Sequence, residues 1–219
     1  PTHGQIDLID LGSNSIRFDM ANDIMGDTAP AILPGDSITF DISTPRTGAV
    51  LHGHPRLFYT MKTNPLFDPY RLHPTTGSVE GDTVKTQTGV VVPNRWSFDL
   101  PDDHLFYPGD IIHYFIYAED DVGGHVMSTT MPEELDGYGV FPGDPDYRPH
   151  VWPSSFTVHG LPTVSDVSGT QPPILFYNDF GGRGGENEWI ASLDNLGYVE
   201  GVDYDLYYVN APSSGVSNG

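Results

Sequence analysis

The stretch FYPGDIIHYFIYAEDDVGGHVMS, residues 106–128, decides the fold class. Its Pro-Gly-Asp at 108–110 predicts a type II turn, because Pro presets φ at the first corner and Gly accepts the positive φ of the second. The run DIIHYFIYAE (110–119) is rich in β-branched and aromatic residues, as strands are. After an acidic, glycine-containing turn comes another β-rich run, HVMSTT (125–130). We therefore expect a turn, a long strand, a second turn and another strand.

Similar β-rich runs recur from residue 5 to about residue 160, and several alternate as half-buried strands do. They are QIDLIDL (5–11), SIRFDM (15–20), SITFDIS (37–43), AVLHGHPRLFYTMK (49–62), RWSFDL (95–100) and SSFTVHG (154–160). Together with the two runs above, they predict a mainly β chain with an antiparallel Ig-like β-sandwich over residues 1–160. Pro-Gly-Asp recurs at 34–36 and 142–144, which predicts the same turn there.

The composition changes after the sandwich. Residues 161–173, LPTVSDVSGTQPP, are rich in Pro, Ser and Thr and are predicted to be a domain linker. The expected elements that follow are a buried strand (ILFYND, 174–179), an amphipathic helix (ENEWIASLDNLGY, 186–198) with Trp189, Leu193 and Leu196 on one face and Gly197 at its end, and a second strand (YDLYYVNA, 204–211). This is one βαβ unit, which cannot bury both faces of a sheet alone. We therefore expect 174–219 to be the N-terminal part of an incomplete α/β domain.

The charge of the chain excludes several classes of function. Against 30 Asp+Glu stand 9 Lys+Arg, which gives a formal net charge of −21 over 219 residues. The electrostatic footprint of nucleic-acid binding is therefore absent, and anionic membranes are poor partners. Three readings of the negative charge stay open: a solvated surface, adaptation to high salt, and binding of divalent cations. No apolar run approaches the roughly 18 residues of a membrane span, so no membrane insertion is predicted.

Cysteine is absent from the chain. This excludes disulfides, thiolate catalysis and Cys-based zinc sites within these residues. The chain opens on Pro1 and closes on SSGVSNG, so we expect it to be part of a longer polypeptide, with any catalytic residues beyond residue 219. No G-x-S-x-G elbow or other catalytic centre is recognisable, and the sequence leaves open whether the chain belongs to an enzyme.

The glycine-rich loop FGGRGGEN, residues 180–187, follows a predicted strand and precedes a predicted helix. It lacks the third glycine of a dinucleotide fingerprint, since Asn187 stands in that place, and it lacks the Gly-Lys-Ser/Thr of a Walker A loop. Three interpretations remain: a structural turn, part of a ligand site completed by other residues, and a phosphate site. Asp179 and Arg183 are the candidate ligand-binding residues here, because loops after parallel strands often bind ligands.

Acidic loops provide candidate calcium ligands. Glu119, Asp120 and Asp121 end a predicted strand, and Asp144 and Asp146 lie in the long loop 131–153. Carboxylates and backbone carbonyls are the ligands that Ca²⁺ prefers, although the spacing is not that of an EF-hand. The alternative at both places is a solvated turn.

Two further features of the sequence have both a structural and a functional reading. His52 and His54 have the spacing that places two imidazoles on one face of a strand, where they could chelate a metal if a third ligand converged. Hydrogen-bonded or exposed histidines are the alternative. Trp152, with the tyrosines of its loop, either covers the end of the sandwich or forms a carbohydrate-binding platform.

Two segments resemble known families. FYPGDIIHYFIYAEDDVGGHVMS resembles the late strands of Ig-like and fibronectin III-like modules in secreted bacterial proteins, and residues 173–219 are similar to the start of an α/β domain that follows such modules. Some proteins with this arrangement carry a C-terminal sorting domain, and a few resemble gingipain-type peptidases. The resemblance implies architecture and location only. Since gingipain-type catalysis needs a Cys, no catalytic residue is carried over to this chain.

The expected function is therefore a non-catalytic structural or adhesive region of a large secreted or cell-surface bacterial protein. Its expected partners are other domains of the same polypeptide, or further copies of itself. One alternative is the accessory region of a secreted hydrolase, peptidase or glycan-active, whose catalytic residues lie beyond residue 219. The other is a carbohydrate-binding module.

Overall fold

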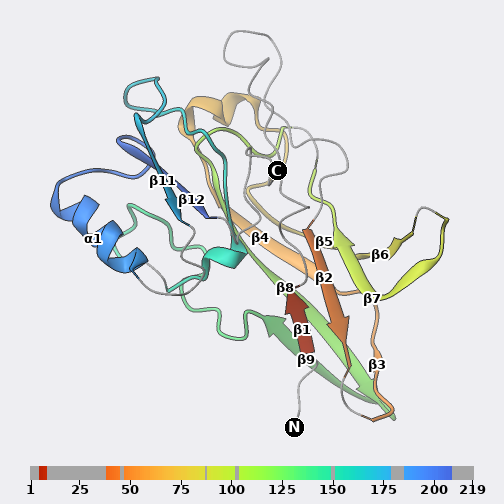
Figure 1. Ribbon diagram of the computed structural model, residues 1–219. Coiled ribbons are helices and arrows are strands. Elements are labelled where there is room, and N and C mark those ends of the chain that lie inside the picture. Colours follow the sequence, from red (N-terminus) through yellow and green to blue (C-terminus); the bar gives the residue numbers. More distant parts are fainter. Residues whose placement is uncertain are drawn as a thin grey trace.

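The computed structural model describes residues 5–8, 38–44, 47–86, 88–101, 104–148, 151–178 and 185–208 (Figure 1). The predicted strand 15–20 and the predicted turn 34–36 lie outside these residues. Asp179 and Arg183 also lie outside them, so the two candidate ligand residues of the glycine-rich loop stay predictions.

The strands from β1 to β10 form two antiparallel sheets in the described part of the chain. The first has the order β1 (Gln5–Leu8), β2 (Ile38–Ser43), β7 (Val91–Phe98), β6 (Asp82–Lys85). The second has the order β10 (Thr157–His159), β8 (Ile111–Val122), β4 (Arg56–Lys62), β5 (Thr76–Glu80), and β3 (Val50–Leu51) and β9 (His125–Met131) also pair with β8. The mainly β, antiparallel fold predicted from the sequence is confirmed.

The two sheets share one hydrophobic core. Alternate residues of β8 are buried, among them Ile112, Tyr114 and Ile116, and they join one cluster with buried side chains of β2 from the other sheet. The ring of Phe40 in β2 meets that of Tyr114 edge to face, with 6.4 Å between centroids. Period-two alternation therefore places one face of each sheet against the other, as in a β-sandwich.

Strand β8 organises the second sheet. Its first half pairs with β4, from Tyr117 opposite Arg56 to Ile111 opposite Lys62. Its second half pairs with β9 across a two-residue hairpin, in which Gly123 and Gly124 have φ of 61° and 87°. Positive φ at both central residues is what a type I′ hairpin turn requires, so these glycines fix the register of the hairpin.

Some strand predictions are wrong. The run 49–62 is not one strand, because Gly53 has a φ of 76° and the residues between β3 and β4 leave the sheet. His52 and His54 therefore do not share a strand face, and the premise of a chelating pair fails. Residues 154–156 form a short 3-10 helix, η3 (Ser154–Phe156), and β5 and β6 arise in a polar stretch where we predicted no strand. A second 3-10 helix, η2 (Pro65–Tyr70), also has no counterpart among the predicted elements.

The predicted βαβ unit is confirmed. Strands β11 (Ile174–Asn178) and β12 (Tyr204–Tyr208) are parallel, and α1 (Glu186–Asn195) lies between them in the chain. Figure 1 shows these three elements grouped beside the sheets. The helix ends as expected: Gly197 has a φ of 81°, and the N–H groups of Gly197 and Tyr198 donate to the carbonyls of Asp194 and Leu193. This pattern is a Schellman motif.

The predicted apolar face of α1 is partly wrong. Ile190 is buried and packs with Leu193 against the strands, whereas Trp189 is 56% exposed and Leu196 is 73% exposed. Ile190 and Leu193 are three residues apart and so lie on the same side of the helix. Since β11 and β12 are the only strands of this unit in the described residues, the contact stripe on α1 is narrow.

Candidate functional site

Two of the Pro-Gly-Asp turns lie in the described residues, and both have the predicted geometry. The N–H of Asp110 donates to the carbonyl of Tyr107 at 3.0 Å, and Gly109 has a φ of 90°. In each turn the Asp carboxylate also accepts a hydrogen bond from the N–H at the start of the turn, at 2.8 Å in both cases. The second turn runs from Phe141 to Asp144 and has the same backbone hydrogen bond, at 3.0 Å. The carboxylate therefore closes its own turn.

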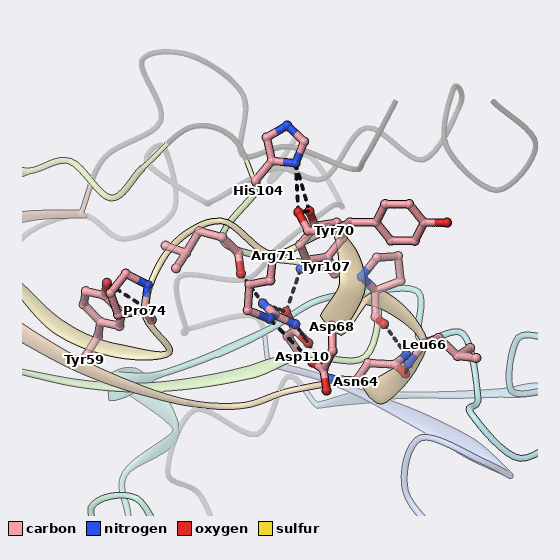
Figure 2. Close-up of polar contacts among 12 residues, drawn as sticks. Tyr59, Asn64, Leu66, Asp68, Tyr70, Arg71, Pro74, His104, Tyr107 and Asp110 are labelled. Atoms are coloured by element: carbon pink, nitrogen blue, oxygen red, sulfur yellow. Dashed lines mark hydrogen bonds and ion pairs between the residues drawn. The ribbon is translucent and has the colours of Figure 1, made fainter. Parts of the chain in front are cut away.

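Asp110 is the centre of a buried polar network (Figure 2). Its carboxylate accepts from the N–H groups of Asn64 at 2.6 Å and Tyr107 at 2.8 Å, and from both terminal nitrogens of Arg71 at 2.9 and 3.0 Å. The Arg71 side chain is only 6% exposed and lies over the Tyr107 ring. Burial raises the pKa of Asp110, while Arg71 and the two backbone donors act to lower it. The bidentate geometry suits an ionised pair.

Asn64 connects this network to the predicted linker. Its side-chain nitrogen donates to the carbonyls of Pro108 at 2.6 Å and Val164 at 2.7 Å. On the other side of the segment, the N–H of Thr163 donates to Oδ2 of Asp205 in β12, at 3.0 Å. Residues 161–173 are therefore hydrogen-bonded both to the sandwich and to the α/β unit.

The space between the sandwich and the α/β unit holds two neighbouring pockets, which together we call the junction cleft. The larger, about 230 Å³, is lined in part by His113, Trp152, His159, Glu186 and Glu200. The smaller, about 50 Å³, shares His159 and Glu200 with it and adds Lys62 and Asp205. The cleft thus combines side chains from β4, β8 and β10 with side chains from the βαβ unit.

The cleft contains titratable groups with displaced pKa values. His159 Nδ1 lies 3.5 Å from Glu200 Oε1, and both side chains are mostly buried. Burial, together with nearby Lys62, lowers the pKa of His159 to about 4. Burial also raises the pKa of Glu200 to about 7, with the negative charges of Asp205 and Asp194 acting in the same direction and Lys62 against it.

His113 lies on the same face of the second sheet as His159. Burial, and the neighbouring His159, lower the pKa of His113 to about 3, so both imidazoles are neutral near pH 7. His113 is 4% exposed and its Nδ1 has no hydrogen-bond partner in the described part of the chain. Asp205 is 5% exposed, and its Oδ1 also has no hydrogen-bond partner among the described residues. Buried polar atoms in proteins are normally satisfied, so these two need a physical account.

Two aromatic side chains of loop 131–153, Tyr138 and Phe141, pack on the outer face of the second sheet. Phe141 packs on His113 with 4.2 Å between ring centroids, and Tyr138 meets Phe115 at 5.0 Å. The expectation that these rings cover the end of the sandwich is thus corrected, because odd-numbered residues of β8 point away from the core. Trp152 is 7% exposed, and its Nε1 donates to the carbonyl of Phe156 at 3.0 Å. Glycan binding at Trp152 stays a prediction.

The candidate calcium ligands make local contacts. Glu119 accepts from the hydroxyl of Tyr117 at 2.5 Å, and Asp121 accepts from the N–H of Gly124 at 2.6 Å, inside the hairpin turn. Asp120 is 3% exposed, whereas Asp144 and Asp146 are exposed. Across the described ranges, no three His, Asp or Glu side chains are grouped so that they could hold a metal ion. Calcium at these positions stays a prediction.

No protein family, curated protein or solved structure matches the chain. Within the described segments, no helix combines the length and the apolar character needed to cross a membrane. Sequence reasoning missed Lys62, Glu200 and Asp205, because no local motif marks residues that meet only after the two units dock.

Proposed function

We propose that this chain is a non-catalytic structural region of a large secreted or cell-surface bacterial protein. In this role an Ig-like sandwich carries the α/β unit and fixes its orientation, and the partners are other domains of the same polypeptide. The observation that supports the proposal is the double anchoring of residues 161–173, to Asn64 on the sandwich and to Asp205 on the α/β unit.

Moving residues 161–173 away from the sandwich would cost free energy. A flexible linker exposes its backbone to water, whereas Val164 and Ser165 are 6% and 2% exposed. Releasing the segment would leave the buried amide of Asn64 without the Val164 carbonyl and would uncover the Val164 side chain. Unsatisfied buried groups cost about 1–3 kcal/mol each, so the docked arrangement is favoured over free hinging. A fixed orientation is what a spacing or presenting module needs.

Limited proteolysis with a protease of broad specificity tests this function. We expect residues 161–173 to resist cleavage in the wild-type chain and to be cut early in Asn64→Ala, which loses the bond to Val164. Val167→Ala is the matched control, because Val167 lies in the same segment and is 79% exposed. Early cleavage of the wild-type segment would contradict the proposal.

Hydrogen exchange of the unmodified chain provides a second measurement that needs no variant. The N–H of Thr163 should exchange slowly, because it is held by Asp205. Exchange at the rate of an open chain, while the strands of the sandwich stay protected, would show that the α/β unit moves freely and that the structural role proposed here is wrong.

A further inference from the structure

The two orphaned atoms of the junction cleft are both acceptors. A carboxylate oxygen such as Oδ1 of Asp205 can only accept hydrogen bonds. The ring of His113 makes a hydrogen bond with the backbone of Gly137, and in a neutral imidazole the N–H is used in that bond. Nδ1 of His113, which has no partner among the described residues, is then an acceptor as well. Asp205 lines the smaller pocket, so this pocket can take a hydrogen-bond donor that the described residues do not supply, whereas His113 lines the larger pocket.

The shape of the cleft separates a small polar end from a larger, partly apolar space. The 50 Å³ pocket, with Asp205, Glu200 and Lys62, has room for about one or two water-sized groups. The 230 Å³ pocket that continues from it is lined by Trp152, Leu206 and two prolines as well as by polar groups. A ligand with a small donor head and a short carbon skeleton fits this division.

Charge decides which donor head is preferred. At the small polar end, Glu200 and Asp205 contribute carboxyl groups to the walls, against the ammonium of Lys62, which already donates to the carbonyl of Pro142 at 2.6 Å. A neutral hydroxyl would satisfy an acceptor but would leave this excess of carboxylates uncompensated. A primary ammonium offers three donors together with a positive charge.

We propose that the junction cleft binds a small organic amine, with its ammonium group between Glu200 and Asp205 and its carbon chain against Trp152 and Leu206. This site is independent of the structural role proposed above. A bound amine would contact the sandwich and the α/β unit at once, so it would also strengthen their docking.

The dependence on pH follows from the groups that face Glu200. These are Lys62 of β4, Tyr147 of loop 131–153, His159 of β10, Glu186 and Asp194 of α1, and Tyr204 and Asp205 of β12. Because the pKa of Glu200 is raised to about 7, its carboxyl is mostly protonated below neutrality and mostly ionised above it. The histidines stay neutral across this range. Amine affinity should rise with pH, by up to roughly tenfold between about pH 6 and about pH 8.

An NMR titration of the isotope-labelled chain with n-butylamine tests the site. We expect saturable shifts of amides near Glu200 and Asp205, and a loss of affinity of tenfold or more in Glu200→Gln, which keeps the shape of the side chain. Asp166→Asn is the control, since it removes one exposed carboxylate outside the cleft and should change affinity less than twofold. The spectrum of each variant reports whether it is folded.

Three results would overturn the proposal. The first is the absence of saturation up to about 50 mM amine, an affinity too weak for a site. The second is equal binding of 1-butanol or glucose, which would mean that the ammonium group is not recognised. The third is an equal loss in Asp166→Asn and Glu200→Gln, which would indicate diffuse attraction to the negatively charged chain. Flat pH dependence in the wild type would also overturn the proposal, because the ammonium would then not lie beside Glu200.

Discussion

The turns at Tyr107–Asp110 and Phe141–Asp144 have the same local chemistry and very different surroundings. Each is an aromatic residue followed by Pro-Gly-Asp, with the same backbone bond and the same carboxylate bond back to the start of the turn. Asp110 is fully buried and pairs with Arg71, whereas Asp144 is exposed. Four residues can therefore fix the backbone conformation of a turn, while burial and long-range partners determine how much the stability of the fold depends on that turn.

Removing the two carboxylates should give the largest difference between the turns. Asp110→Ala leaves the guanidinium of Arg71 buried without its counter-ion, and breaking a buried pair costs about 3–5 kcal/mol. We expect a loss of about 4 kcal/mol in the free energy of unfolding, or failure to fold, measured by urea denaturation. If Arg71→Met combined with Asp110→Ala were as destabilised as Asp110→Ala alone, the unpaired charge would not be the cause.

The second largest difference in stability is expected between alanine substitutions at the glycines of the two turns. A Cβ on Gly109 would lie 2.8 Å from Nδ2 of Asn64 and 3.0 Å from the side chain of Thr163, whereas the nearest atom to a Cβ on Gly143 is Nζ of Lys62 at 4.0 Å. Both substitutions to Ala incur the strain of positive φ, about 1 kcal/mol. We expect Gly109→Ala to cost about 3 kcal/mol in urea denaturation and Gly143→Ala about 1 kcal/mol. Equal costs would show that the buried network yields easily to the extra methyl group.

Acid should affect the surroundings of the second turn through His113, on which Phe141 packs. The folded-state pKa of His113, about 3, is below its ordinary value of 6.5, so the unfolded chain binds the proton first as pH falls. Stability is therefore lost from about pH 6.5 downward, and this group accounts for a loss of about 2.5 kcal/mol between about pH 7 and about pH 4.5. His113→Phe keeps a ring in the stack and should flatten this loss.

The measurement for His113 is the urea midpoint of both proteins at about pH 7 and about pH 4.5. His125→Phe is the control, because His125 is exposed at the start of β9. If His113→Phe lost as much stability as the wild type between these two pH values, other groups, such as His159, would be responsible for the acid dependence.

The smallest effect is expected for the exposed carboxylate of the second turn. Asp144→Ala removes one hydrogen bond to the N–H of Phe141, and a single bond of this kind contributes about 1 kcal/mol or less. The urea midpoint should shift only slightly, and the Arg71–Asp110 pair should be unaffected. A loss approaching that of Asp110→Ala would mean that the second turn has buried partners in the folded chain that its exposure does not indicate.

Much of the local structure could be predicted because single residues dictate it. The glycines of the type II turns, the Gly123-Gly124 hairpin and Gly197 after α1 all have the positive φ that their positions require. Strand β8 could be predicted from its β-branched and aromatic residues. Strands β5 and β6 were missed because both sequences are short and mostly polar, and β5 also contains Gly77. Pairing with β4 and β7 supplies the stabilisation that the side-chain pattern does not indicate.

The sequence by itself determined the fold class, the turn types and the βαβ unit, since these depend on backbone geometry and on side-chain period over a few residues. Only the tertiary structure decided which of the two Pro-Gly-Asp turns is buried and paired with Arg71, and which face of α1 meets the strands. It alone brought His159 of the sandwich to Glu200 of the α/β unit. Such pairs depend on how whole elements pack, and burial and displaced pKa values follow from that packing.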